Sequence, residues 1–315
     1  MSAILSSIDV ILQDGFMYSI LAMGYYISYT ILDFPDLTVE GTVLSGGVVF
    51  GLLVRAGVNP WIALVVSFIT GFVFGSVTGL LHVKLGIRPL LCGILVSTAL
   101  ISVNLVVTVV GMGGNFAGDG ALSTIDLGRG VPTLLRSFPA NLLPTDFKGF
   151  NLQRLITFFA IAVICKILLD LYLKTKSGLM LRATGSNSQY VTMLAKDQRF
   201  YKVLGLAIGN GLAAVSGALI VQSRNNVNQG MGIGMIVIGL ASLIIGLSVF
   251  GKVRFMKPTT MVIFGSVIYQ GCLGIATLLG VPSAYNKIIM AALFTVALVS
   301  SGAIRKRGEH KNVRT

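Results

Sequence analysis

The stretch that decides the class of fold is residues 60–81, which read PWIALVVSFITGFVFGSVTGLL. It holds no Asp, Glu, Lys or Arg, and it is long enough for a helix to cross the hydrocarbon core of a bilayer. Gly71, Gly75 and Gly79 recur at every fourth position, so they lie on one face of that helix. Small residues let helix backbones approach closely in lipid, and we interpret this face as a packing seam with little bearing on chemistry.

Similar apolar stretches recur along the whole chain. The sequence is 54% hydrophobic and only 11% charged, a balance outside the range of soluble globular proteins. We therefore expect an all-α membrane protein, with residues 1–315 forming a single transmembrane domain of about nine helices. The predicted transmembrane helices are residues 12–32, 38–54, 60–81, 90–111, 152–173, 201–222, 233–250, 259–279 and 286–303.

The N-terminal region and the cysteines add little chemistry. No Lys or Arg precedes Arg55, so the basic segment of a cleavable signal peptide is missing, and we expect the first helix to be retained. Cys92, Cys165 and Cys272 lie singly inside apolar stretches, which indicates small buried hydrophobic residues rather than a disulfide or a metal site.

The basic residues record the orientation in the membrane. The formal net charge is +13, but Lys and Arg are spread among the connections, which argues against a nucleic-acid partner. Sixteen of the 24 belong to one side, in residues 82–89, 174–202, 251–258 and 304–315. Cytoplasmic loops carry the Lys and Arg excess, so this side is predicted to be cytoplasmic, including the basic tail 304–315. Counting back through nine helices puts the N-terminus outside, although the first connections carry almost no charge to fix it.

Two connections are long enough to have a function. Residues 112–150 are rich in Gly, Pro and Asn, and we expect an extracytoplasmic lid or docking surface. Residues 174–200 form the long cytoplasmic connection, where Ser186 or Asn187 can cap a short amphipathic helix. One face of that helix would carry Tyr190, Met193 and Leu194. Such a helix can lie on the lipid surface or fit a groove in a partner protein.

The chain also contains a candidate inverted repeat. Residues 36–54 and 231–250 each open a glycine-punctuated helix, and each is followed by a short link with a proline, Pro60 or Pro258. The predicted topology makes the two units antiparallel, and inverted repeats place a translocation path at their interface near the bilayer midplane. The alternative is convergence, because glycine-rich helices pack well in lipid without any common origin.

An acidic segment interrupts the first unit. Residues 33–41 read DFPDLTVEG, in which Pro35 and Gly41 break a hydrophobic stretch, as in a discontinuous helix that lines a cavity. The residues that we predict to line a translocation pathway are Asp36, Thr38, Glu40, Gly41, Gly232, Gly234 and Ser242. The alternative is a tight polar turn in which Asp36 or Thr38 caps the second helix.

The sequence contains no motif that indicates an enzyme. The sequence has no Gly-x-x-x-x-Gly-Lys-Ser/Thr loop, so any ATP energy must come from a partner. His82 and His310 belong to no nucleophile–base or zinc-binding pattern, and we expect no catalytic residue, no metal and no cofactor bound by this chain. Asp170 lies one turn after Lys166, which predicts a structural ion pair.

Three short motifs resemble the landmarks of the permeases of ribose and branched-chain amino acid ABC importers. They are Asp36-Leu-Thr-Val, Gly185-Ser-Asn187 and Gly239-Leu-Ala-Ser-Leu-Ile-Ile-Gly246. The run FPDLTVEG at 34–41 more closely resembles a bacterial subgroup often associated with aromatic amino acid uptake. The resemblance spans about residues 12–303, and each motif alone is only moderately specific.

This resemblance implies a permease of the bacterial cytoplasmic membrane that moves a small solute by alternating access, with an amino acid, aromatic ones included, as the expected solute. Its implied partners are ATP-binding-cassette ATPase subunits that bind ATP and Mg, an extracytoplasmic solute-binding protein, membrane lipid and a second permease in a homodimer or pseudo-dimer. It also implies that the short cytoplasmic helix is the coupling helix that docks on the ATPase. The coupling residues would be Gly185, Ser186, Asn187, Ser188, Gln189, Tyr190, Met193 and Leu194.

The chain departs from the sugar-type pattern in two ways. Glu40 precedes Gly41 where ribose-type permeases have Gly directly after the Asp-Leu-Ser-Val run, which puts sugar in doubt as the solute. The extra N-terminal helix of many relatives is absent, in agreement with nine helices and an external N-terminus. The alternative function is a stand-alone secondary transporter or channel, in which Asp36 and Glu40 would bind a coupling cation and the basic loop would contact anionic lipid.

Overall fold

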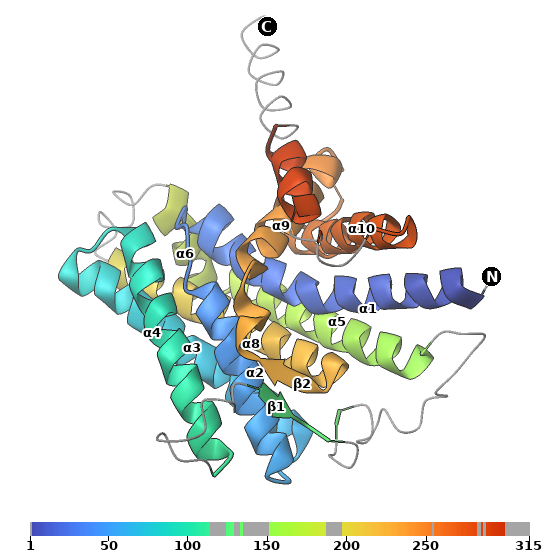
Figure 1. The fold of residues 1–315 in the computed structure, drawn as a ribbon. Helices are drawn as coiled ribbons and strands as arrows, with labels where there is room; N and C mark the ends of the chain where they lie inside the picture. The colour runs from blue at the N-terminus through green and yellow to red at the C-terminus, as the bar shows by residue number, and fades with distance from the viewer. Residues whose placement is uncertain are drawn as a thin grey trace, which may run out of the picture.

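The computed structural model describes residues 2–113, 124–128, 133–134, 151–186, 197–253, 255–281, 285 and 288–299. The regular elements in this part of the chain are helices apart from one short two-stranded ribbon, which confirms the expected all-α class (Figure 1). The helices are α1 (Ser2–Tyr25), η1 (Tyr26–Ile31, a π-helix), α2 (Val39–Arg55), α3 (Pro60–Leu85), α4 (Pro89–Gly111), α5 (Leu152–Lys174), α6 (Lys176–Ser186), α8 (Gln198–Arg224), η3 (Gln229–Gly232, a 3₁₀-helix), α9 (Met235–Phe250), α10 (Pro258–Leu278) and the short apolar helix Ile288–Val299.

Six helical segments of the described residues are long and apolar enough to cross a membrane: α3, α4, α5, α8, the η3–α9 segment and α10. The 17 residues of α2 rise only about 1.5 Å each, so this helix is shorter than the hydrocarbon core of about 30 Å. Each of the nine predicted stretches overlaps a helix. The count of nine transmembrane helices is not confirmed and stays a prediction.

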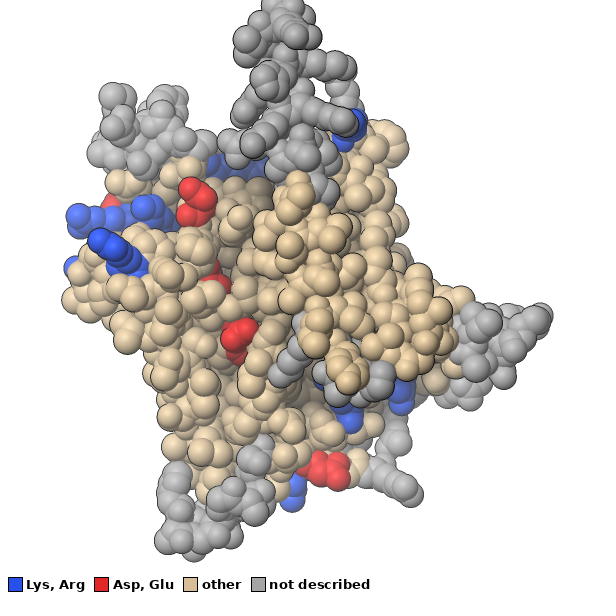
Figure 2. Space-filling view, turned by 45° about the horizontal axis from the view of Figure 1, so that its top comes forward, with Lys and Arg blue, Asp and Glu red and all other residues tan. Residues whose placement is uncertain are grey.

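The outer surface suits lipid rather than water. Along α3, apolar side chains at spacings of three and four residues are exposed, among them Ile62, Val65, Ile69 and Val73. A contiguous exposed apolar surface of this kind marks a membrane or protein contact. In the face drawn in Figure 2, one group of Lys and Arg side chains lies at the left and upper edges and another lies in the lower part, and the surface between the two groups is mainly tan. That distribution is the one expected of a protein with two aqueous faces and a hydrocarbon belt.

The buried centre of the fold is α8, against which α1, α2 and α3 pack. One glycine of each helix contacts the α8 backbone. Gly24 of α1 contacts Gly209, Gly46 of α2 contacts Ala214, and Gly71 of α3 contacts Asn210. A Cβ at any of the three would overlap a backbone carbonyl of α8. The predicted seam of α3 is thereby confirmed, because Gly75 and Gly79 face α8 as well.

The second half of the chain wraps around α1. In Figure 1, α1 runs alongside α5 and α10, and it contacts both of them as well as α9. Glycines again permit the close approach, since the backbone of Gly265 on α10 lies against the carbonyl of Ser242 on α9. Thus α10 packs on α1 and α9, much as α3 packs on α8 and α2.

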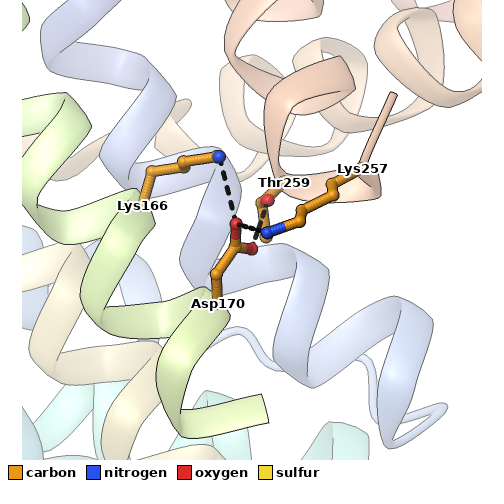
Figure 3. A network of polar contacts seen from close by, with 4 residues as sticks. All are labelled: Lys166, Asp170, Lys257 and Thr259. Atoms are coloured by element: carbon orange, nitrogen blue, oxygen red, sulfur yellow. Dashed lines mark hydrogen bonds and ion pairs between the residues drawn. The ribbon is translucent and has the colours of Figure 1, made fainter. Parts of the chain in front are cut away.

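One ionic cluster ties α5 to the start of α10 (Figure 3). The predicted pair is confirmed, with Lys166 Nζ 3.0 Å from Asp170 Oδ2. Sequence spacing did not reveal the other two partners: Lys257 Nζ lies 3.0 Å from the same oxygen, and Thr259 Oγ1 donates to Asp170 Oδ1 at 2.6 Å. Because one carboxylate bridges two helices, we assign this cluster a structural role.

The ribbon joins part of the predicted outer connection to the end of α8. β1 (Thr124–Asp126) pairs antiparallel with β2 (Asn226–Asn228), directly after α8 ends at Asn225 in a left-handed conformation with φ 54°. Most of the outer connection 112–150 and the whole basic tail 304–315 lie outside the described residues.

The seam between α3 and α8 predicts a strong effect of Gly75→Val. The added carbons would meet the Leu206 carbonyl and the Asn210 side chain, so we expect the free energy of unfolding to fall by about 1–3 kcal/mol. The measurement is the thermal unfolding midpoint in detergent. The matched control is Val73→Leu on the outer face of the same helix, where the Val73 side chain is 50% exposed. This change should leave the midpoint unchanged. Equal midpoints for both variants would contradict the seam.

Candidate functional site

The first helix breaks between η1 and α2. The backbone leaves helical geometry over residues 32–38, where Asp33 adopts a left-handed φ of 52° and Phe34 N donates to the Ser28 carbonyl at 2.9 Å. The ring of Phe34 packs edge-on against His82 of α3, with 5.3 Å between ring centroids. The break is therefore held by neighbours on both sides, as expected where irregular backbone is buried in protein.

Asp36 forms the centre of a buried polar network. Its Oδ1 accepts a hydrogen bond from Thr38 N at 2.9 Å, and its Oδ2 accepts one from Asn210 Nδ2 at 2.6 Å. Asn210 Oδ1 in turn accepts from Thr42 Oγ1 at 2.9 Å. A carboxylate with this little exposure, 3%, requires such partners because burial without them costs several kcal/mol. The network fixes the start of α2 to α8.

Thr38 has a different role from the predicted side-chain cap. It occupies the N-cap position of α2, but its hydroxyl makes no cap bond. Instead, Thr38 Oγ1 lies 2.9 Å from Thr78 Oγ1 on α3. Asp36 makes a cap-like contact instead, because its carboxylate accepts a hydrogen bond from the Thr38 N–H just before α2 begins.

Glu40 connects the two broken segments. Its Oε1 accepts a hydrogen bond from Gly234 N at 2.9 Å, and Gly234 adopts a left-handed φ of 89° at the N-cap of α9. Such a conformation favours glycine. The α-carbon of Gly232 lies against the Glu40 carbonyl, so a side chain there would overlap it. The structure thus brings together Glu40, Gly232 and Gly234, three of the residues predicted to line the pathway.

A hollow of about 250 Å³ lies beside Glu40 and Gly41, between α2, α4 and η3. Gln229 lines it, and within the described residues the Oε1 of this side chain is buried without a hydrogen-bond partner. Ser97 of α4 lines it as well, and nearby Asn104 Nδ2 donates to the Gly41 carbonyl at 3.3 Å. The hollow therefore offers a carboxylate, an amide and a hydroxyl to a small polar solute.

Ser242 lies apart from this hollow. It is buried in α9, its carbonyl faces Gly265 of α10, and its hydroxyl has no hydrogen-bond partner among the described residues. Tyr25 is similar, because its hydroxyl is buried without a partner while its ring packs on Gly239. Of the seven predicted pathway residues, six surround the joined breaks and Ser242 belongs to the α9–α10 contact.

Sequence reasoning missed the amide side chains of this region. Asn104, Asn210 and Gln229 were not singled out, although two of them lie inside predicted transmembrane helices. A strongly polar residue at membrane depth is itself a signal, since it needs a partner in the helix bundle. That rule would have identified Asn104 and Asn210 without naming the groups they contact.

The predicted coupling region begins at the broken helix. Gly185 and Ser186 end α6, and the α-carbon of Gly185 lies against the Ile31 carbonyl at the end of η1. Only a glycine permits this approach, since a Cβ would overlap the carbonyl. The remaining predicted coupling residues lie outside the described residues: Asn187, Ser188, Gln189, Tyr190, Met193 and Leu194.

The arrangement supports binding rather than catalysis. Its polar groups are carboxylates, amides and hydroxyls, and within the described ranges no three His, Cys, Asp or Glu side chains cluster to hold a metal ion. Such groups can recognise a polar solute or stabilise irregular backbone at membrane depth.

Comparison with known proteins places the chain among transport proteins. The family described as branched-chain amino acid transport system / permease component matches residues 7–298. The tyrosine transport system permease protein of Clostridioides difficile (strain R20291) is 36% identical over 298 residues, which cover 95% of this chain and 92% of the relative. An uncharacterized protein of Rickettsia prowazekii (strain Madrid E) is 30% identical over 293 residues, or 92% and 95% of the two chains.

A probable branched-chain amino acid transport permease protein of Methanocaldococcus jannaschii is 27% identical over 219 residues, which cover 67% of this chain and 65% of the relative. No solved structure matches the chain. These findings bear out the resemblance drawn from the motifs, and like it they cover almost the whole length of the sequence.

The Asp36 network predicts that Asn210→Leu is destabilising, because the buried carboxylate loses its shortest hydrogen bond. We expect a loss of about 1–3 kcal/mol in the free energy of unfolding, measured by denaturant titration in mixed micelles. Gln222→Leu is the control on the same helix. Gln222 is equally buried, but its side chain has no hydrogen-bond partner among the described residues, so its replacement should cost little. Equal losses would remove the special role of Asn210.

Proposed function

This chain belongs to the family of branched-chain amino acid transport permease components, and from that premise we propose that it is the membrane-spanning subunit of an ATP-binding-cassette importer. Its solute would be an amino acid, with an aromatic side chain as the first choice. The relative from Clostridioides difficile, a tyrosine transport system permease protein, supports that choice, as does the FPDLTVEG run at 34–41.

The observation that carries the proposal is the contact between α6 and η1. Gly185 stands at the end of the helix that leads into the cytoplasmic connection, and its backbone lies against Ile31. Five residues after Ile31 comes Asp36, the centre of the buried network. A force applied by an ATPase to the cytoplasmic connection would therefore reach the broken helix through rigid backbone contacts, since Gly185 has no flexible side chain to absorb it.

The pathway is proposed to run along the joined breaks. The Glu40–Gly234 hydrogen bond links the N-terminus of α2 to the N-terminus of α9, and the hollow beside Glu40 provides space for a polar solute. Rocking of the two units about this junction would open it alternately to the outside and to the cytoplasm.

An inverted repeat of the two halves would support such rocking. In the first half, α2 and α3 pack on α8, which belongs to the second half. In the second half, α9 and α10 pack on α1, which belongs to the first half. An internal two-fold relation between the halves would produce this pattern. We propose that the two halves are inverted copies, which their common sequence pattern also favours.

The proposed complex contains a permease homodimer, two ATPase subunits that hold ATP and Mg, and a solute-binding protein on the outer side. The chain would lie in the bacterial cytoplasmic membrane as a single transmembrane domain, with its N-terminus outside and its basic C-terminal tail in the cytoplasm. Residues 112–150 would face the binding protein, and residues 174–200 would face the ATPase.

Glu40→Gln is predicted to lower the rate of ATP-driven uptake roughly threefold to tenfold, because a neutral amide accepts the Gly234 N–H more weakly than a carboxylate does. Asp36→Asn should also impair uptake, which is measured in proteoliposomes with both partners present. The control is Asp9→Asn, which changes a carboxylate that accepts a backbone N–H from Asn151 and does not line the hollow. If both variants transport normally, the two carboxylates only cap helices.

Leu194→Asp tests the coupling assignment. A charge on the apolar face of the short helix predicted from the sequence should abolish ATP-driven uptake and uncouple the ATPase, while membrane insertion stays intact. Leu85→Asp, at a 67% exposed leucine of another cytoplasmic connection, should transport normally. Normal uptake by Leu194→Asp would refute the coupling role. Uptake by the purified chain without an ATPase would instead establish the rival secondary transporter.

A further inference from the structure

A second hollow is lined by α1 and shares no residue with the hollow beside Glu40. It encloses about 230 Å³ between α1, α8, α9, α10 and the helix Ile288–Val299. Its polar wall is formed by Asp14, Tyr18, Arg224 and Gln270. Thr277 and Gly274 also line it, and apolar side chains, including Ile238 and Leu273, form the rest. A small concave space with a few convergent polar groups and an apolar remainder is the usual form of a solute site.

Two opposite charges face this hollow without forming an ion pair. Arg224 Nη2 donates to Tyr18 Oη at 3.1 Å, which orients the guanidinium, and its positive charge acts on the Asp14 carboxyl. In the part of the chain that the structure describes, ion pairs are formed only by Asp170, and the Asp14 carboxylate accepts no hydrogen bond. Charges held apart in a partly buried space leave both available to a ligand.

A third polar group points to the same ligand. Gln270 is only 7% exposed, yet its side chain makes no hydrogen bond within the described residues. Because no described protein group bonds to it, this amide is available to a molecule in the hollow. An amide can donate to a carboxylate or accept from an ammonium group, so it serves either end of a zwitterion.

The hollow lies at the end of the bundle that the topology assigns to the outside. Arg224 is the last residue of α8, Thr277 belongs to the last turn of α10, and Met290 belongs to the first turn of the helix Ile288–Val299. α8 and α10 start from the basic cytoplasmic connections, so all three helix ends lie on the outer side. A solute arriving from outside would meet this hollow before the Glu40 junction.

We propose that this hollow binds the main-chain zwitterion of an amino acid at the outer end of the permease. Arg224 holds the α-carboxylate, since a guanidinium binds a carboxylate through two parallel N–H bonds. Asp14 holds the α-ammonium group, Gln270 bonds to either, and the apolar wall receives the side chain. The inference rests on the proposed function for its solute class, and it adds a recognition site within the permease itself.

The test is direct binding of radiolabelled L-tyrosine and L-leucine to the purified full chain in lipid nanodiscs, at concentrations up to the millimolar range. Tyramine lacks the carboxylate, and 3-(4-hydroxyphenyl)propionate lacks the ammonium group. Both should compete with tyrosine at least roughly tenfold more weakly than unlabelled tyrosine does.

Each variant should lose affinity for one end of the ligand. Arg224→Gln should weaken tyrosine binding roughly tenfold to hundredfold and leave tyramine binding unchanged, whereas Asp14→Asn should weaken tyrosine and spare the propionate. Arg55→Gln is the control, since this arginine also belongs to the outer side but bonds to Met112 at another place in the fold. A merely structural role would weaken all three ligands together.

Three results would overturn the proposal: no binding of either amino acid by the unaltered chain, unchanged tyrosine affinity in both variants, or an equal loss for tyrosine and its analogues. ATP-driven uptake by the complete complex separates this inference from the proposed function. Uptake that persists with an unchanged KM in Arg224→Gln would sink the hollow alone. Amino acid binding without ATP-driven uptake by the complex would sink the importer and leave the hollow in place.

Discussion

The fold depends on how closely three helices approach the backbone of α8. Lipid gives apolar helices no reason to associate, so their contacts rely on dispersion at short range and on hydrogen bonds. Gly24, Gly46 and Gly71 supply that short range by leaving room for α8 carbonyls. The same approach places Asn210 within hydrogen-bond reach of Asp36. The glycine seam, which we expected to have little bearing on chemistry, thus positions the polar network.

The polar groups of the bundle serve breaks in helices. Asp36 binds the irregular backbone after η1, and Glu40 binds the start of α9. Unwound backbone leaves N–H and C=O groups without helical partners, and at membrane depth only protein can satisfy them. The two carboxylates therefore stabilise segments in which some N–H groups would otherwise lack hydrogen-bond partners. Such segments are suited to movement, because their hydrogen bonds come from neighbours that can shift.

The two hollows differ in chemistry. The one beside Glu40 adjoins the junction of the breaks and offers few polar side chains beside glycines and the apolar Leu44, Ile101 and Ile233. The one beside Arg224 presents both signs of charge and a large apolar wall near the outer helix ends. The outer hollow beside Arg224, with more recognition groups, would select the solute first. The hollow beside Glu40, with fewer of them, would release it readily, since tight binding at every step would slow transport.

The sequence by itself determined the membrane class, the positions of the helices, the glycine face of α3 and the Lys166–Asp170 pair. These depend on composition or on neighbours within two turns, and helical geometry fixes such neighbours wherever the helix lies. Only the tertiary structure decided that Asp36 binds Asn210, 174 residues away, that Glu40 binds Gly234, and that Asp14 and Arg224 share a hollow. Contacts between distant helices depend on how each helix is rotated and at what angle it crosses its neighbours. The close packing of the whole bundle sets these angles, and sequence periodicity does not determine them.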